Sequence, residues 1–250
     1  MRLVCLALLL TACPADDTGS DTSLDTDSEI DTGSDTELDS DTELFEPADG
    51  FGVISGDCGP LDATEIVSDS PFVFQSAIDL PAGFDDNLLS DGGLEMVDAG
   101  NLNPGSLYSE VFSYEVLYRC EDAALLLTEG EVTYTDPSGK KTDLVIDVDG
   151  YRLGMSVVRA VTWPRDTEMT VERAEELLDD KLGDILISSA NVSDDDAWDK
   201  QILHVIAYSP NHANAVVTAH GNLSAAVRAD TILWVTATNG TDGFIYGDDD

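Results

Sequence analysis

The sequence predicts an α/β fold, in which a mixed central sheet is flanked by helices and a disordered N-terminal tail precedes the folded part. Two observations lead to this prediction. From residue 106 onward, segments with helical spacing of apolar residues alternate with short apolar strands in the order α-β-β-β-α-β-α-β. The chain of 250 residues has a formal charge of -40, and fourteen of its acidic residues lie between Pro14 and Gly50, a stretch without Lys or Arg. Such a stretch stays unfolded, whereas 42% hydrophobic residues in the whole chain are enough for a core.

The first thirteen residues have the layout of a secretory signal peptide. Arg2 precedes the apolar run from Leu3 to Leu10, and two small residues, Thr11 and Ala12, follow before a cysteine. The apolar run is too short for a membrane-spanning helix, which needs about 20 residues. We therefore expect an exported protein.

The end of this signal, Leu10 to Cys13, resembles the lipobox of bacterial lipoproteins. The resemblance implies that residues 1–12 are removed and that Cys13 carries the lipid, palmitate included, as the first mature residue. The membrane is then a partner through the N-terminal lipid, and the protein faces the periplasm or the exterior of the cell envelope. An ordinary signal peptide with an incidental cysteine is the alternative.

Residues 13–50 form the predicted tether. The hexapeptide DTGSDT occurs at Asp17 and again at Asp31, and DTEL occurs at Asp35 and Asp41. Asp, Thr, Ser and Gly bury too little apolar surface to offset the entropy of ordering the chain, so we expect an extended, disordered spacer. The carboxylates do not follow the frame of a calcium-binding EF-hand loop, so no defined calcium site is predicted.

Two cysteines remain for the folded part once Cys5 leaves with the signal and Cys13 takes lipid. Cys58 and Cys120 form an even pair in an exported domain, which indicates one disulfide. Two free buried thiols are the alternative. Neither cysteine has a partner at the spacing of a zinc site.

The folded part is predicted to have an irregular layer over residues 51–105, which are rich in Gly, Pro, Asp and Ser, and a mixed α/β domain over residues 106–247. The domain begins with a helix that Ser106 caps and that runs to about Glu121. Three antiparallel strands follow, over Glu131–Thr135, Thr142–Val148 and Tyr151–Val161, the last two joined by a tight turn at Asp149 and Gly150.

The second half of the domain returns to helical spacing. Thr170 caps a helix that runs to about Ser189, and the apolar strand Ile202–Tyr208 is predicted to be central because both of its faces are apolar. Pro210 opens a helix in the region of Ala213–Val227, and Thr231–Thr238 is the last strand.

This order, with a helical Glu ahead of a hairpin that carries an Asp, resembles the PD-(D/E)XK restriction-endonuclease-like fold. The resemblance implies clustered carboxylates that hold Mg²⁺ and a lysine that orients the nucleophile. Glu110 or Glu115 would be the helical acid and Asp143 the strand acid, which makes Glu110 and Asp143 the candidate metal ligands.

The third strand departs from the family pattern of an acid followed two residues later by Lys. One register places Ser156 and Val158 at these positions, and the other places Val157 and Arg159 there. Either way the second metal-binding carboxylate is missing, and an Arg is always protonated and cannot act as a base. The sequence therefore predicts no cofactor, and Mg²⁺ enters only under the catalytic alternative.

Two functional hypotheses remain, with a third behind them. The favoured one is a membrane-anchored lipoprotein whose nuclease-like domain has lost catalysis and binds an unidentified protein or small molecule; the acidity excludes general binding of nucleic acids. The alternative is a metal-dependent phosphodiesterase or nuclease with a migrated site, built from Glu110, Asp143, Asp147 and Arg159. The third hypothesis is a carbohydrate-binding face formed by tryptophans: Trp163, Trp198 and Trp234.

Overall fold

The computed structural model describes residues 51–80, 84–165 and 167–246. The predicted signal peptide, the lipidated Cys13 and the acidic tether lie outside these residues. Within the described ranges, no helix combines the length and the apolar character that a membrane span requires.

The predicted mixed sheet is confirmed and has seven strands in the order β1-β2-β7-β6-β5-β4-β3. The four consecutive strands β2, β7, β6 and β5 are parallel, while β1 pairs antiparallel with β2, and β4 and β3 continue antiparallel from β5. The strands are β1 (Val53–Gly56), β2 (Val73–Asp79), β3 (Ala124–Thr128), β4 (Leu144–Val148), β5 (Tyr151–Ala160), β6 (Lys200–Ala207) and β7 (Ile232–Ala237).

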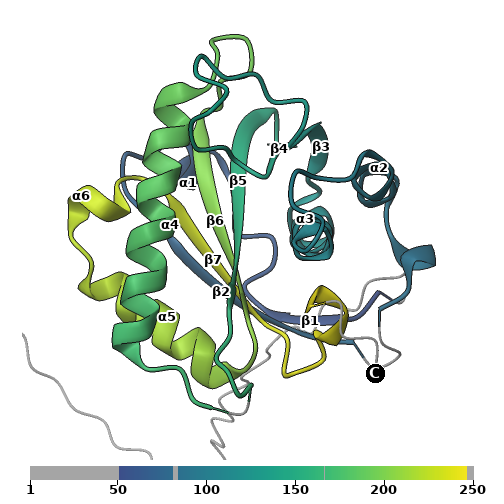
Figure 1. Cartoon of the computed structure of the whole chain (residues 1–250), viewed down its shortest axis with the longest axis vertical. Helices are drawn as coiled ribbons and strands as arrows, with labels where there is room; N and C mark the ends of the chain where they lie inside the picture. The colour runs from purple at the N-terminus through teal and green to yellow at the C-terminus, as the bar shows by residue number, and fades with distance from the viewer. Residues whose placement is uncertain (1–50, 81–83, 166, 247–250) are drawn as a thin grey trace, which may run out of the picture. The chain divides into compact units, whose positions relative to one another are not determined.

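Helices cover both faces of the sheet, as Figure 1 shows: α2 and α3 lie on one side, α4 and α5 on the other. Each side has its own apolar core, one that includes Phe112 and Trp234 and one that includes Leu178 and Val216. The helices are α1 (Ala63–Ile66), α2 (Asp91–Ala99), α3 (Leu107–Glu121), α4 (Val171–Asn191), α5 (Pro210–Asn222) and α6 (Ala225–Arg228), with short 3₁₀ turns η1 (Asp86–Leu88) and η2 (Gly243–Tyr246).

Most of the predicted caps, turns and buried strands occur in the structure at the predicted residues. The Thr170 hydroxyl accepts a hydrogen bond from the Arg173 N–H at the start of α4, and all eight residues of β6 are buried. Asp149 and Gly150 adopt positive φ angles of 53° and 85° and join β4 to β5. Ser106 precedes α3 as predicted, but its hydroxyl donates to the Asn103 carbonyl and does not cap the helix.

The first strand of the antiparallel trio was predicted at the wrong place. It is β3, which begins three residues after α3 ends and pairs with β4. The run Ala124–Thr128 is apolar and follows directly on Asp122, whose left-handed backbone ends the helix. The predicted segment, Glu131–Thr135, instead forms a loop in which Tyr134 makes an isolated bridge to Val192.

The prediction of an irregular layer over residues 51–105 also needs correction. This segment contributes β1 and β2, which extend the sheet beyond the C-terminal strand β7. β2 lies parallel to β7, so its pairing partner comes from about 160 residues further along the chain; Ser76, for example, pairs with Thr236. Local composition gave no sign of a partner so distant in sequence.

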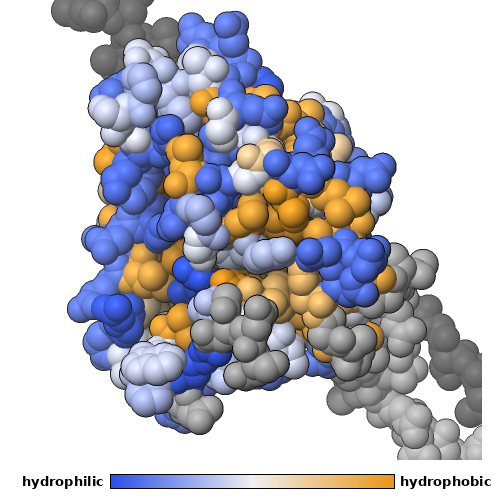
Figure 2. All heavy atoms as spheres, turned by 45° about the vertical axis from the view of Figure 1, so that its right-hand side comes forward, coloured by the Kyte–Doolittle hydropathy of each residue, from blue (hydrophilic) through white to orange (hydrophobic). Residues whose placement is uncertain are grey.

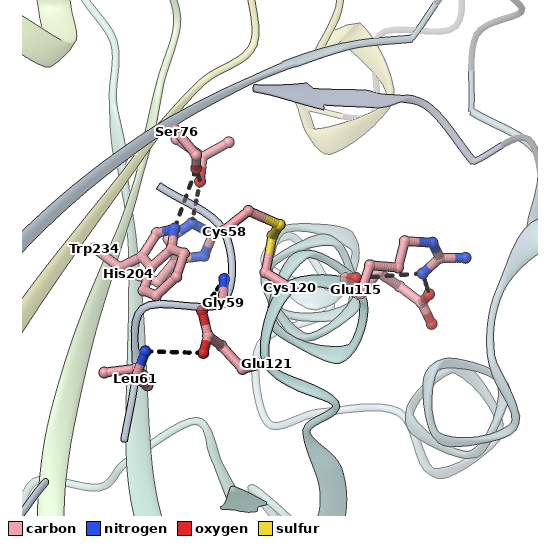
Figure 3. The surroundings of a disulfide bond; sticks show 11 residues. Cys58, Gly59, Leu61, Ser76, Glu115, Cys120, Glu121, His204 and Trp234 are labelled. Carbon is pink, nitrogen blue, oxygen red and sulfur yellow. Dashed lines mark hydrogen bonds and ion pairs between the residues drawn. A yellow bond between two sulfur atoms is a disulfide. The ribbon is translucent and has the colours of Figure 1, made fainter. Parts of the chain in front are cut away.

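A disulfide joins Cys58 to Cys120 and ties the start of the described domain to the end of α3. Figure 3 shows the neighbouring contact, in which the Glu121 carboxylate accepts the backbone N–H groups of Gly59 at 2.8 Å and Leu61 at 3.1 Å. Burial raises the pKa of Glu121 to about 7, although both N–H groups lower it. The position of α3 against the sheet is therefore fixed covalently and by hydrogen bonds.

The surface on the side of α2 and α3 is not uniformly polar. Figure 2 shows apolar residues gathered between hydrophilic ones on this face. Exposed apolar side chains on these elements and on the edge strand β3 include Leu94, Tyr118 and Leu126.

Candidate ligand-binding cleft

Three of the predicted site residues converge on one cavity. Glu110, Asp143 and Arg159 line a space of about 600 Å³ beyond the carboxyl end of β5, and two residues that the sequence did not suggest, Glu129 and Lys181, line it as well. We call this cavity, with these five charged residues, the carboxyl cleft.

The sheet itself makes room for the carboxyl cleft. β4 begins only at Leu144, whereas β5 continues to Ala160, so the last part of β5 has no strand beside it on that edge. Glu110 comes from α3 on one face of the sheet and Lys181 from α4 on the other, and both line the cavity past the start of β4.

Asp143 directly precedes β4 and pairs with β5 at the point where β4 has not yet begun. Its backbone N–H donates to the Met155 carbonyl at 3.0 Å, and its carboxylate accepts the Val157 N–H at 2.6 Å. The side chain thereby continues the hydrogen-bond ladder of β5 by one step. This is a structural role, and it occupies one oxygen of the strongest catalytic candidate.

The contacts of β5 also decide between the two registers of the third strand. Val157 belongs to the core on the α3 side, together with Leu153 and Met155, whereas Val158 belongs to the core on the α4 side. Side chains alternate along a strand, so Arg159 faces the same side as Val157. In the pattern that the nuclease resemblance implies, the positions of the acid and the lysine are therefore those of Val157 and Arg159.

Burial dominates the electrostatics of the cleft. Glu110 is only 4% exposed, its Oε1 accepts the Asn101 amide at 2.8 Å, and burial with nearby Asp143 raises its pKa to about 8. Burial also raises the pKa of Asp143 to about 7, although the Val157 N–H and Lys181 lower it. Glu110 therefore holds its proton at neutral pH and can donate a hydrogen bond.

The two other acidic candidates lie elsewhere. Asp147 accepts the Gly150 N–H at 3.0 Å, inside the hairpin turn at the opposite end of β4. Glu115 is buried in an ion pair with Arg119 and accepts both the N–H and the hydroxyl of Ser90. Glu110 is thus the acid that α3 contributes to the cleft.

The sequence analysis did not predict that Glu129 and Lys181 line the cleft, and the reason differs between the two residues. Glu129 follows β3, whose place was mispredicted, so nothing indicated that it would come back toward β5. Lys181 lies between the buried residues Leu178 and Leu182 of α4, where helical spacing alone describes a solvated lysine. Eight of the ten basic residues after Phe51 fall between Lys140 and Lys200, which was the available signal.

The donor set does not fit the Mg²⁺ that the nuclease resemblance implies. Val157, an apolar residue, stands where the second carboxylate belongs; Asp143 already accepts a backbone N–H; and Glu110 is protonated at neutral pH. Among the described residues, no three side chains of the His, Cys, Asp or Glu type are grouped closely enough to hold a metal ion.

The three tryptophans do not form one face. Trp234 is fully buried in the core, where its indole N–H donates to the Ser76 hydroxyl beside His204 (Figure 3), and Trp198 packs against a small cluster around Val145. Trp163 is 84% exposed and stands alone among them at the surface.

Comparisons with known proteins add one relative. The chain is 35% identical over 173 residues to the "AAC-rich mRNA clone AAC4 protein" of Dictyostelium discoideum, a match that covers 66% of this chain and 25% of that protein. The chain thus spans about a quarter of the relative's length. No family model matches the chain, and no solved structure does. The name of the relative states no activity.

Proposed function

We propose that this protein is a lipid-anchored binding protein of the bacterial cell envelope, whose α/β domain carries a ligand cleft without nuclease activity. One observation carries the proposal: Glu110, Asp143 and Arg159 line one cleft, and Val157 occupies the position where the nuclease resemblance implies an acid.

The chemistry of the cleft suits binding. A protonated Glu110 donates a hydrogen bond, and Arg159 and Lys181 donate with positive charge, so the cavity offers donors to a ligand's oxygen atoms. Arg159 is held in place because its guanidinium donates to the Ile245 carbonyl at 3.1 Å and lies 5.1 Å from the ring centroid of Tyr246. Such fixed donors lower the entropy cost of binding a polar ligand.

The overall charge argues against a nucleic-acid substrate. Residues 51–250 contain 37 acidic and 10 basic side chains, and a polyphosphate chain would be repelled from most of this surface. The anchor rests on the lipobox at Leu10 to Cys13, followed by an acidic tether that would hold the domain away from the lipid.

A nuclease assay tests the loss of catalysis. Incubation of the full mature chain with Mg²⁺ or Mn²⁺ and single- or double-stranded DNA or RNA is expected to give no cleavage. Turnover that Asp143→Asn abolishes would overturn the proposal. Asp147→Asn is the matched control, because Asp147 lies at the far end of β4.

The catalytic alternative has one specific observation in its favour. Lys181 enters the carboxyl cleft from α4 and supplies a lysine that the third strand lacks, with Glu129 as a further carboxylate. A phosphodiesterase with this migrated set would lose turnover on Lys181→Gln and on Glu129→Gln, and the assay above distinguishes it from the favoured function.

Membrane release tests the anchor. Replacing Cys13 with Ser should move the protein from the membrane fraction to the soluble fraction, because the thiol that takes lipid is gone. A Cys13→Ser protein that stays with the membranes would show that the lipoprotein assignment is wrong; Cys5→Ser, in the same signal, is the control.

A further inference from the structure

A second cavity adjoins the carboxyl cleft and has a different set of charged side chains. It encloses about 690 Å³ beyond the end of β5, and we call it the arginine pocket. It shares Val161 and Tyr246 with the carboxyl cleft, and the other described residues that line it are Thr162, Trp163, Arg165, Thr167 and Arg173. None of these lining residues is acidic.

This charge pattern is selective in so acidic a protein. Residues 51–250 have more than three carboxylates for each basic side chain, yet the described lining of the pocket has two guanidinium groups and no carboxylate. Arg165 lies over the Tyr246 ring, 4.5 Å from its centroid, and Arg173 stands in the first turn of α4 with an exposed ion pair to Glu176. The amino end of this long helix, which begins at Val171, adds a partial positive charge beside the pocket.

An exposed indole stands in the same wall. Trp163 is 84% exposed, and no other large apolar side chain among the described residues is as exposed. A tryptophan held in water contributes nothing to the core, and its flat face is a platform on which a sugar or a nucleobase ring stacks.

The loop that carries Trp163 and Arg165 is fixed from behind by a chain of hydrogen bonds. The Thr162 hydroxyl donates to the Thr167 carbonyl, so its oxygen accepts from His212 Nε2, 3.2 Å away. His212 Nδ1 then accepts from the Ser209 hydroxyl at 2.7 Å. Burial lowers the pKa of His212, which keeps the ring neutral and this direction of donation intact.

A second contact holds the end of the same loop. The Met169 N–H donates to the Asn211 side-chain oxygen at 2.9 Å, so residues on both sides of Arg165 are tied to the start of α5. The pocket is therefore formed before any ligand arrives, which lowers the entropy cost of binding.

We propose that the arginine pocket binds a small ring compound that carries an anionic group, with the ring on Trp163 and the anion on Arg165 and Arg173. Guanidinium groups take carboxylate and phosphate in the same forked geometry, so both anions belong to the proposed class. The proposal goes beyond the proposed function, because the arginine pocket is a second cavity beside the carboxyl cleft.

Four probes test this ligand class on the full mature chain by isothermal titration calorimetry at pH 7. Adenosine monophosphate and glucuronate carry an anion on a ring; adenosine and glucose are their neutral counterparts. We expect one-site binding of at least one anionic probe, at least about tenfold tighter than its neutral counterpart. Which anionic probe binds distinguishes phosphate from carboxylate, and either result supports the proposal.

Variants locate the binding. Arg165→Gln and Arg173→Gln should each weaken the anionic probe about tenfold, and Trp163→Ala should weaken it by a similar factor. Arg152→Gln is the matched control, because Arg152 donates to the Asp195 carbonyl outside both cavities. Circular dichroism and a thermal melt verify that each variant is folded.

Three results would overturn the proposal: neither anionic probe binds at millimolar concentration, the neutral counterparts bind equally well, or Arg152→Gln weakens binding as much as Arg165→Gln. These results are separable from failure of the proposed function. Nuclease turnover would reject the non-catalytic binding protein, whereas absence of both turnover and probe binding rejects only the ligand class.

Discussion

The carboxyl cleft and the arginine pocket are neighbours of similar volume, but they are held together in different ways. The cleft contains three carboxyl groups, of which Glu110 is almost wholly buried and Asp143 bonds to the backbone of β5. The pocket has no carboxylate in its described lining, and its Trp163 is exposed. Changes in the cleft should therefore alter the stability of the fold, whereas changes in the pocket wall should alter ligand binding.

The difference also shows what net charge can and cannot say. A charge of -40 excludes a broad basic face, yet it does not prevent a few cations from gathering where the backbone brings them together. Arg159, Arg165, Arg173 and Lys181 all line one of the two cavities. Local chemistry, and not the total, decides what each cavity can bind.

The largest expected effect comes from removal of the disulfide, which supports the carboxyl cleft but not the arginine pocket. Cys120→Ser removes a disulfide that spans 62 residues and ties down the helix that carries Glu110, so the free energy of unfolding should fall by about 4 kcal/mol. The loop of the arginine pocket is tied to α5 instead, so probe affinity should be unchanged while the protein is folded. Denaturant titration measures the first quantity and calorimetry the second.

The control for this prediction is the wild-type protein in reductant, which should lose the same stability. A Cys120→Ser variant within about 1 kcal/mol of wild type would contradict the covalent support of α3. Cys58→Ser should match Cys120→Ser, because either substitution removes the same bond.

A smaller effect is expected from the acid of the cleft. Asp143→Ala leaves the Val157 N–H without its acceptor, which should cost about 1 to 3 kcal/mol of unfolding free energy. Asp143→Asn keeps an oxygen at that position and should lose clearly less. Equal losses for the two variants, measured by denaturant titration, would show that charge and not the extended ladder gives Asp143 its role.

The pH dependence of stability follows from the same buried carboxyls. The pKa is raised to about 8 for Glu110 and to about 7 for Asp143 and Glu121, so the folded state binds protons that the unfolded state has lost above pH 4.5. This stabilisation is complete in acid and is lost as pH rises through the folded pKa values. His204 and His220, whose pKa values burial lowers to about 3 and about 4, act in the opposite direction and lose their stabilisation as pH falls below 6.5.

The contributions of the carboxyl groups and of the histidines to stability partly cancel between pH 4.5 and 6.5. Above pH 6.5, mainly the contribution of the carboxyl groups still changes, and it decreases. We expect the free energy of unfolding to fall by about 2 to 3 kcal/mol between pH 6.5 and 8. Glu110→Gln should make this fall shallower, because Gln donates like the protonated acid and does not titrate. A variant with the same slope as wild type would contradict the raised pKa of Glu110.

Elements of the fold that are set by residues close in sequence could be predicted, whereas elements set by distant residues could not. The β4–β5 turn, the cap of α4 and the buried β6 are set by neighbouring residues, and the sequence predicted them. β3 was misplaced because a turn signal after Thr135 favoured an alternating segment over the apolar run that starts at Ala124. β2 was missed because its partner β7 is the last strand of the chain.

The candidate site likewise contains residues that were predicted from the sequence and residues that were not. Glu110, Asp143 and Arg159 were candidates because the resemblance to the restriction-endonuclease-like fold implies their positions, and the cleft does contain them. Lys181 could not be predicted, since it reaches the cleft only because β4 begins late and leaves the edge of β5 open. Asp147, four residues from Asp143, lies at the other end of β4, next to the hairpin turn.

The smallest expected effect concerns the support of the arginine pocket. His212→Gln breaks the hydrogen-bond chain between Ser209 and Thr162, which should cost about 1 kcal/mol of stability and weaken the anionic probe a few-fold by loosening the loop. The pH dependence set by Glu110 should stay unchanged, because His212 lines neither cavity. His220→Gln, on the same helix, is the control and should leave probe affinity as it is. If both variants weaken the probe equally, α5 as a whole and not the chain through His212 holds the pocket in shape.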